Sequence, residues 1–301
     1  MSGSAARLGG IALLAGGSLV AGCGKDEPGT GGASSFGKPA PTVAKSYEGL
    51  PVEAWTARLS DPDPAARFEA TVAVAALDAA KDEGKVLLVG LLADRSATVR
   101  FGALDALGRI AEPDPPVVLS ALALLEDADD GVRRHAKTVA TRWGVASIPA
   151  LRARLASKDD HVRRDVLSVL AALGADAAPA VPELSALLAG EDLAAQDDAA
   201  QGLAAMGAAG VPALMKALLD PRADTAVLAA AALERLGSVA APAVPDLAAG
   251  LRRGGAVRRA SLEALVAVGD AARAALEAAS KDADEAVRDA AKDGLERLPK
   301  R

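Results

Sequence analysis

Apolar residues return at a fixed spacing in eight successive segments of the chain. From an anchor residue in each segment, the residues 4, 8 and 11 positions further on are also apolar or small. Steps of this size follow one face of an α-helix, because about 3.6 residues make one turn. The pattern therefore predicts eight similar helices, spaced 30–33 residues apart. Their anchors are Ala66, Val99, Val132, Val162, Ala195, Thr225, Val257 and Val287.

Two further positions of the repeat predict how each helix packs and where it ends. The residue four positions after the anchor is nearly always small, so a neighbouring helix can approach closely. Twelve positions after the anchor, five segments carry a glycine, which is the residue that best adopts the left-handed conformation at a helix end. The last segment has Pro299 there, which stops the final helix. The five glycines are Gly144, Gly174, Gly207, Gly237 and Gly269.

A shorter apolar segment precedes each of these helices and predicts a first helix for each pair. Such first helices are expected at 86–92, 117–125, 148–155, 181–188, 211–219 and 244–251. Several have Pro in the first turn, where the missing N–H has no helical partner: Pro149, Pro182, Pro212 and Pro245. Hydrophobic residues make up 51% of the chain but aromatic residues only 2%. The apolar content thus lies in Ala, Leu and Val, which favours an all-α fold.

Four turns between paired helices carry an Asp six residues before an Arg of the following helix. The pairs are Asp61–Arg67, Asp94–Arg100, Asp127–Arg133 and Asp282–Arg288. In this feature the chain resembles HEAT repeats of the short bacterial, PBS-lyase type over about residues 50–299. The resemblance implies a right-handed α-solenoid, an armadillo-like α–α superhelix of about eight two-helix repeats. It also implies a ladder of polar contacts between the turn Asp and the helix Arg of neighbouring repeats.

The middle repeats depart from this Asp–Arg pattern. Ser157 and Arg252 stand where a turn acid is expected, and Gln196 and Ala226 stand where a helix Arg is expected. We therefore expect the ladder to be interrupted there, and the stack to bend or loosen. Trp55, in the first helix, is expected to belong to an N-terminal cap of the solenoid.

Residues 1–22 have the layout of a secretory signal peptide. Arg7 gives a short positive region, an apolar stretch runs from Leu8 to Val20, and small residues follow. The ending Val20-Ala21-Gly22-Cys23 resembles the lipobox of bacterial lipoproteins, which implies cleavage before Cys23 and acylation of its thiol. The alternative is an ordinary signal peptide that contains a cysteine. Cys23 is the only cysteine of the chain, so it can form no internal disulfide.

The chain is expected to have three parts: the signal peptide 1–22, a tether 23–48 that begins with lipidated Cys23, and the solenoid 49–301. The tether is rich in Gly, Ser, Pro and Thr, a composition that cannot bury enough apolar area to order itself. The resemblance to lipoproteins implies a lipid-anchored protein of the bacterial cell envelope, on its periplasmic or outer-surface side.

Residues that could carry catalysis are scarce. The two histidines, His135 and His161, are expected at the surface near the turns between repeats. Some enzymes of the HEAT-like group bind iron through His-Glu pairs, and this chain has no such pair. It also lacks the Gly-x-Ser-x-Gly and phosphate-loop motifs. We therefore expect no metal, no cofactor and no catalytic residue, and we interpret Trp143, which stands at a core position, as a packing residue.

The charge changes sign midway along the solenoid. In residues 132–164, nine Lys or Arg residues oppose two Asp residues, whereas residues 165–215 contain seven acidic residues and no cation. Opposed patches of this kind can orient a partner, although they can also serve only solubility. We expect the outward-facing cations Arg134, Lys137 and Arg164 to bind a protein partner. The net charge of −6 argues against nucleic acid as that partner.

These features favour a non-catalytic scaffold or adaptor, monomeric and tethered to the membrane, that binds a protein partner on the concave face of the solenoid. The alternative is a lyase-like or metal-dependent enzyme of the HEAT-like group, or its accessory subunit. A third possibility is binding of anionic glycans or lipid groups through the basic repeats. A fold does not set a function by itself.

Overall fold

The computed structural model describes residues 46–77, 83–110 and 112–299. The predicted signal peptide, Cys23 and all but the last three residues of the predicted tether lie outside these residues.

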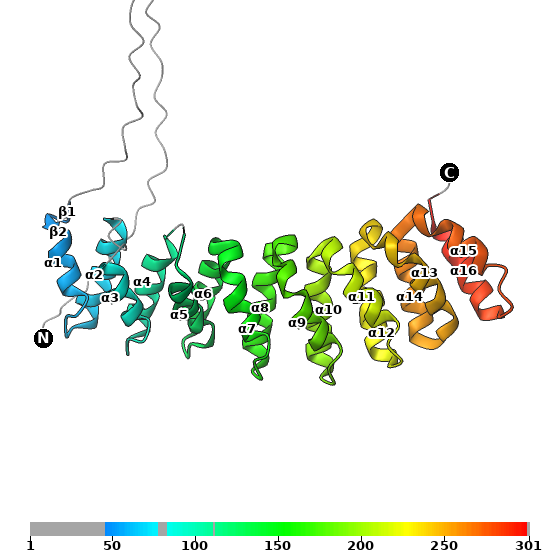
Figure 1. Cartoon of the computed structure of the whole chain (residues 1–301), viewed down its shortest axis with the longest axis horizontal. Helices are drawn as coiled ribbons and strands as arrows, with labels where there is room; N and C mark the ends of the chain where they lie inside the picture. The colour runs from blue at the N-terminus through cyan, green and yellow to red at the C-terminus, as the bar shows by residue number, and fades with distance from the viewer. Residues whose placement is uncertain (1–45, 78–82, 111, 300–301) are drawn as a thin grey trace, which may run out of the picture. The chain divides into compact units, whose positions relative to one another are not determined.

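The described residues form eight consecutive pairs of α-helices, and each pair packs against the next one in the chain (Figure 1). The predicted α-solenoid of two-helix repeats is thereby confirmed. The pairs are α1 Val52–Arg58 and α2 Pro64–Ala76, α3 Glu83–Leu91 and α4 Ala97–Gly108, α5 Pro115–Leu122 and α6 Asp130–Trp143, α7 Ile148–Arg154 and α8 Asp160–Leu173, α9 Val181–Leu188 and α10 Leu193–Ala205, α11 Val211–Leu218 and α12 Ala223–Leu236, α13 Val244–Gly250 and α14 Gly255–Val268, and α15 Arg273–Ala279 and α16 Glu285–Arg297.

The even-numbered helices pack directly against one another because their contact positions are small. All eight residues four positions after the anchors are buried, as the sequence predicts. Gly102 of α4 shows how close the approach is, since a Cβ there would lie 2.2 Å from Thr71 Oγ1 of α2. A side chain at Gly102 would force these two helices apart.

The predicted glycine terminators are present. Gly144, which caps α6, has φ 56°, and Gly174, which caps α8, has φ 57°. A short 3₁₀ segment follows in each case, η2 Gly144–Ser147 and η3 Gly174–Ala180, and leads into the next first helix. Gly207, Gly237 and Gly269 adopt positive φ in the same way.

A small hairpin precedes the first helix. Strands β1 Ser46–Tyr47 and β2 Leu50–Pro51 pair in antiparallel register, so the end of the predicted tether is ordered. Trp55 of α1 is 2% exposed, and its Nε1 donates to the Tyr47 carbonyl at 3.0 Å. The hairpin therefore covers the open end of the first repeat, where Trp55 was expected to form a cap.

The Arg–Asp ladder exists in the first three repeats. Arg67 donates from Nε and Nη2 to the Asp94 carboxylate of the next repeat at 2.8 and 2.9 Å, and Arg100 does the same with Asp127 at 2.7 and 2.6 Å. Each Nη1 donates to the backbone carbonyl of its own turn, Asp61 or Asp94. One guanidinium thus joins two repeats.

The ladder stops at the fourth repeat, where Ser157 replaces the turn acid. Arg133 keeps its bond to the Asp127 carbonyl at 2.7 Å, but its Nη2 turns to Asp130 of its own helix. In the fifth and sixth repeats Gln196 bonds the Gly190 carbonyl instead, and Ala226 is fully buried. The predicted interruption is confirmed.

Two helical stretches, Asp160–Leu188 and Ala223–Arg253, are long and apolar enough to cross a membrane by length and composition alone. Each consists of parts of two successive helix pairs, broken at Gly174 or Gly237, and its buried apolar side chains belong to the solenoid core. Packing between repeats accounts for their composition.

Candidate partner-binding surface

The even-numbered helices carry a half-buried or exposed residue at the same place in the repeat, two positions after the anchor. This position lies about 200° round the helix from the buried anchor, and therefore faces outward. Because successive even-numbered helices are neighbours, these residues form a row, which we call the outer row. From α2 to α10 its members are the half-buried Phe68 and the exposed Phe101, Arg134, Arg164 and Asp197.

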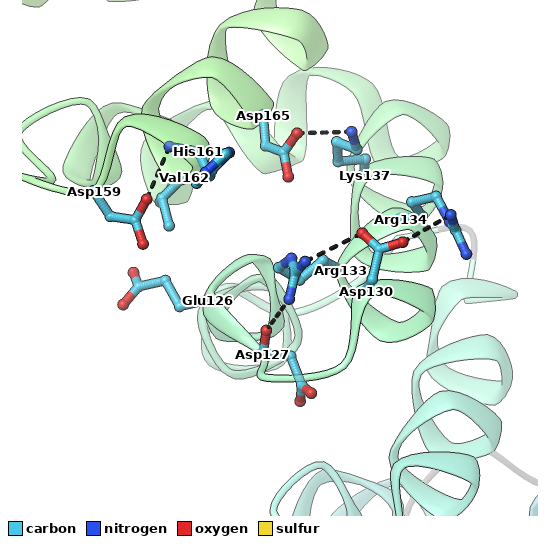
Figure 2. Close-up of a pocket in the computed structure, with 10 residues that line it drawn as sticks. All are labelled: Glu126, Asp127, Asp130, Arg133, Arg134, Lys137, Asp159, His161, Val162 and Asp165. Carbon is cyan, nitrogen blue, oxygen red and sulfur yellow. Dashed lines mark hydrogen bonds and ion pairs between the residues drawn. The ribbon is translucent and has the colours of Figure 1, made fainter.

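Arg134 and Lys137 of α6 lie in one groove with residues of α8 (Figure 2). The groove has a volume of about 330 Å³ and a mainly polar lining. Lys137 Nζ lies 2.7 Å from Asp165, and Arg134 Nη1 lies 2.8 Å from Asp130 of its own helix. The Arg134 side chain is 69% exposed, so its ion pair is weak and the guanidinium is available to a partner.

Arg164 lies in a second groove, of about 240 Å³, between α8 and α10. Its Nε donates to the Asp160 carbonyl at 3.2 Å, and the groove also contains Asp198 and Arg235. Burial raises the pKa of Asp198, and the charge of Arg164 acts in the opposite direction. Of the three predicted site residues, the structure thus brings Arg134 and Lys137 together and places Arg164 in the next groove.

Three ion pairs between repeats join the basic stretch of the sequence to the acidic stretch. Lys137 pairs with Asp165, Arg152 with Glu183 at 2.6 Å, and Arg163 with Asp192 at 3.4 Å. The Arg152 guanidinium holds the pKa of Glu183 below its ordinary value. These pairs engage part of the charge of both stretches, and the remaining charges keep the opposite signs that the sequence predicts. Arg134 and Arg164 of the outer row remain exposed.

His135 differs from its prediction as a surface residue, whereas His161 is exposed as expected. The His135 side chain is 14% exposed, its ring stacks on Phe101 at 4.2 Å, and its Nε2 lies 3.3 Å from Asp105. Burial lowers its pKa, and Asp105 acts in the opposite direction. Sequence reasoning missed Phe101, which is 38% exposed. Its shared repeat position with Arg134 was the signal that could have identified it.

Trp143 is buried, in agreement with its interpretation as a packing residue, and its Nε1 donates to the Ile110 carbonyl at 3.1 Å. Within residues 46–77, 83–110 and 112–299, no group of three or more His, Cys, Asp or Glu side chains is arranged to hold a metal ion.

A comparison with known protein families agrees with this architecture over part of the chain. Residues 52–140 match the family model of HEAT repeats. A comparison with curated protein sequences finds no significant match. Human deoxyhypusine hydroxylase in complex with glycerol shares 23% identity, with 82% of this chain and 95% of that chain covered and a TM-score of 0.35. The complex of CpcE and CpcF of phycocyanin lyase from Nostoc shares 20% identity over 89% of this chain and 100% of that chain, with a TM-score of 0.36.

Importin beta shares 16% identity over 82% of this chain and 41% of that chain, with a TM-score of 0.47. Each of these proteins is similar to this chain at the level of fold alone. The family match identifies residues 52–140 as HEAT repeats, and the helix pairs described above continue the same α-solenoid to Arg297.

Proposed function

We propose that the protein is a non-catalytic scaffold or adaptor that binds a protein partner on its even-helix face, the face that a HEAT solenoid makes concave. The observation that carries the proposal is the outer row, in which the exposed Phe101, Arg134 and Arg164 follow one another on successive even-numbered helices. Trp, Tyr and Arg dominate the energetic centres of protein interfaces, and aromatic residues and Arg are enriched there generally.

The exposed members of the row differ in what they can contribute. Phe101 offers an apolar ring that is already fixed by stacking on His135, so little side-chain freedom is lost when a partner covers it. Arg134 and Arg164 offer guanidinium groups on α6 and α8, and Lys137 lies in the same groove as Arg134. A partner with an apolar residue followed by acidic residues could place the apolar residue on Phe101 and the acids on Arg134 and Arg164.

Reversing the charge of both exposed arginines, Arg134→Glu with Arg164→Glu, is expected to weaken partner binding by at least about tenfold, because each reversal replaces attraction by repulsion. The partner is first captured from membranes with the wild-type protein and identified by mass spectrometry. Its affinity for purified wild-type and variant proteins is then measured by calorimetry, while circular dichroism checks that the helix content is unchanged.

The matched control is Lys216→Glu with Lys281→Glu, which makes the same change in net charge at exposed positions off the outer row. This control is expected to bind the partner as the wild type does. If both double variants lost affinity equally, the effect would come from net charge alone. If neither lost affinity, the outer row would not be part of the interface.

We further propose that the protein is a monomer held at the bacterial cell envelope by acyl chains on Cys23. The motif that supports this is Val20-Ala21-Gly22-Cys23 at the end of the signal-like segment. Each acyl CH₂ that enters the bilayer contributes about 0.8 kcal/mol, so several chains give firm anchoring. Metabolic labelling with a fatty acid is expected to mark the wild type and to fail in Cys23→Ser; label kept by the variant contradicts acylation of this cysteine.

A further inference from the structure

The Arg–Asp ladder defines a place where a carboxylate belongs. At Arg67 and Arg100, the Nε and Nη2 edge of the guanidinium holds one carboxylate through two parallel bonds. That carboxylate always comes from the residue five positions before the next anchor, Asp94 or Asp127. This edge of arginine matches a carboxylate in geometry and charge.

Arg163 is the equivalent arginine of the fourth repeat, but its next repeat has no acid at the ladder position. The residue five positions before the anchor Ala195 is Gly190. Arg163 Nη1 donates to the Ser157 carbonyl at 3.1 Å, and its Nη2 bonds Asp160 at 2.6 Å and Asp192 at 3.4 Å. Among the residues that the structure describes, Nε has no hydrogen-bond partner, although the side chain is only 5% exposed.

A buried guanidinium N–H without a partner is costly, and native proteins rarely leave one. At Arg67 and Arg100 the same atom is satisfied by the turn aspartate of the next repeat, which Gly190 replaces at Arg163. Asp160 and Asp192 engage Nη2 and leave the Nε–H unbonded.

A cavity of about 500 Å³ opens at this position, and we call it the Gly190 cavity. Its volume is within the range of small-molecule sites. Leu155, Ala156, Ala186 and Leu187 give it an apolar lining, and Arg163 and Lys158 contribute positive charge. Lys158 is exposed and makes no ion pair within the described part of the chain.

Three acids, Glu183, Glu191 and Asp192, also line the cavity and equal its three cations in number. Glu183 is held by Arg152, whose Nη2 lies 2.6 Å from it, and Asp192 makes the long contact with Arg163. The attraction for a carboxylate therefore comes from the unbonded Nε–H of Arg163 and the exposed Lys158, and not from a net charge of the lining. The site thus combines a buried donor, a free ammonium group and apolar walls.

We propose that the Gly190 cavity binds a carboxylate carried on a small apolar body, with a carboxylate oxygen accepting from Arg163 Nε in place of the missing turn aspartate. The apolar body packs on Leu155 and Leu187, and Lys158 adds a second cation. The carboxylate belongs either to a free carboxylic acid or to an acidic side chain of a partner. This site is separate from the outer row and does not depend on it.

The test uses the full chain, labelled with ¹⁵N, and follows the Nε–Hε signals of arginine by NMR while hexanoate is added. The Arg163 signal is assigned by its disappearance in Arg163→Lys. It is expected to shift and saturate with hexanoate, to stay in place with the neutral analogue hexanamide, and to leave the Arg100 signal unmoved because Asp127 already occupies that guanidinium. A linear, unsaturated response, or an equal response to hexanamide, overturns the proposal.

Two variants at Gly190 separate the effect of an added carboxylate from that of an added Cβ. A Cβ at Gly190 would lie 3.0 Å from the Leu187 carbonyl oxygen, so Gly190→Asp and Gly190→Ala bring the same tight contact. Gly190→Asp is expected to place its own carboxylate on Arg163, to shift the Nε–Hε signal before any ligand is added and to lose the hexanoate response. Gly190→Ala is expected to keep that response. A hexanoate response that persists in Gly190→Asp places the ligand elsewhere and overturns the proposal.

A last comparison separates the two sources of the carboxylate. A capped Leu-Glu-Leu peptide and its Leu-Gln-Leu counterpart are titrated in the same way. Tighter binding of the glutamate peptide than of hexanoate assigns the site to a partner's side chain, and saturation by hexanoate alone assigns it to a free acid. Failure of both ligands to saturate the Arg163 signal rejects carboxylate binding.

Discussion

Replacing Trp143 with alanine is expected to lower the free energy of unfolding by about 3–5 kcal/mol, the usual range when a buried aromatic side chain is removed. Trp143 is 6% exposed, and it ends α6 against the preceding repeat, where its Nε1 bonds the Ile110 carbonyl. A solenoid has only contacts between neighbours, so a void at this junction cannot be compensated by a distant core. Urea unfolding followed by far-UV circular dichroism measures the loss.

Two controls separate ring packing from the hydrogen bond and from any general effect of substitution. Trp143→Phe keeps most of the buried ring but loses the indole donor, and it is expected to lose less stability than the alanine variant. Thr141→Ala, at an exposed position of the same helix, is expected to change stability by less than about 0.5 kcal/mol. If Trp143→Ala behaved like Thr141→Ala, the junction would not depend on this side chain.

The helix pairs could be predicted closely from the sequence because each repeat buries the same face against the same kind of neighbour. The first helix expected at 181–188 is α9 Val181–Leu188, and the one expected at 148–155 is α7 Ile148–Arg154. Local spacing and glycine terminators decide these boundaries. The Ser46–Tyr47 strand was not predicted, because strands of two residues are too short to show a periodic pattern in the sequence. The hairpin is held instead by a contact with Trp55, which lies eight residues after Tyr47.

The candidate site could be predicted only in part. The outward direction of Arg134 and Arg164 follows from their helical position, and the structure agrees with it. Which charges pair across repeats does not follow, because Lys137–Asp165 and Arg152–Glu183 join residues 28 and 31 positions apart. A charge count along the chain cannot tell a free cation from one that a neighbouring repeat has already bound.

Arg100→Ala is expected to cost about 3 kcal/mol, because it leaves the Asp127 carboxylate buried without its main partner. The Asp127 side chain is only 5% exposed. Arg100 also donates to the Asp94 carbonyl of its own turn, so the substitution removes this bond together with the two bonds to the next repeat. Thermal and urea unfolding near neutral pH measure the loss, with Arg95→Ala as a control at an exposed arginine of the preceding turn.

The pH dependence of this loss separates a buried charge from lost packing. In the wild type, burial tends to raise the pKa of Asp127, but hydrogen bonds from Arg100 and from the Asp129 N–H outweigh it, and the pKa lies below its ordinary value. A lowered folded-state pKa contributes stability that is present above the unfolded pKa of about 3.9 and is lost as the pH falls through the folded value. In Arg100→Ala the burial remains and the main stabilising bond is gone, so the pKa of Asp127 rises.

The stability deficit of Arg100→Ala relative to the wild type should therefore be largest near neutral pH and should shrink as the pH falls towards about 4. Asp127 has the higher pKa in the variant, so it is protonated there at a higher pH than in the wild type, and its buried charge is then removed. Adding Asp127→Asn removes the charge while its side-chain oxygen can still accept from the Asp129 N–H, a bond of 2.8 Å in the wild type. The double variant is expected to be more stable than Arg100→Ala alone near neutral pH. A deficit that stayed constant with pH, or a double variant that added the two single losses, would mean that Arg100 acts through its alkyl packing and not through the carboxylate it holds.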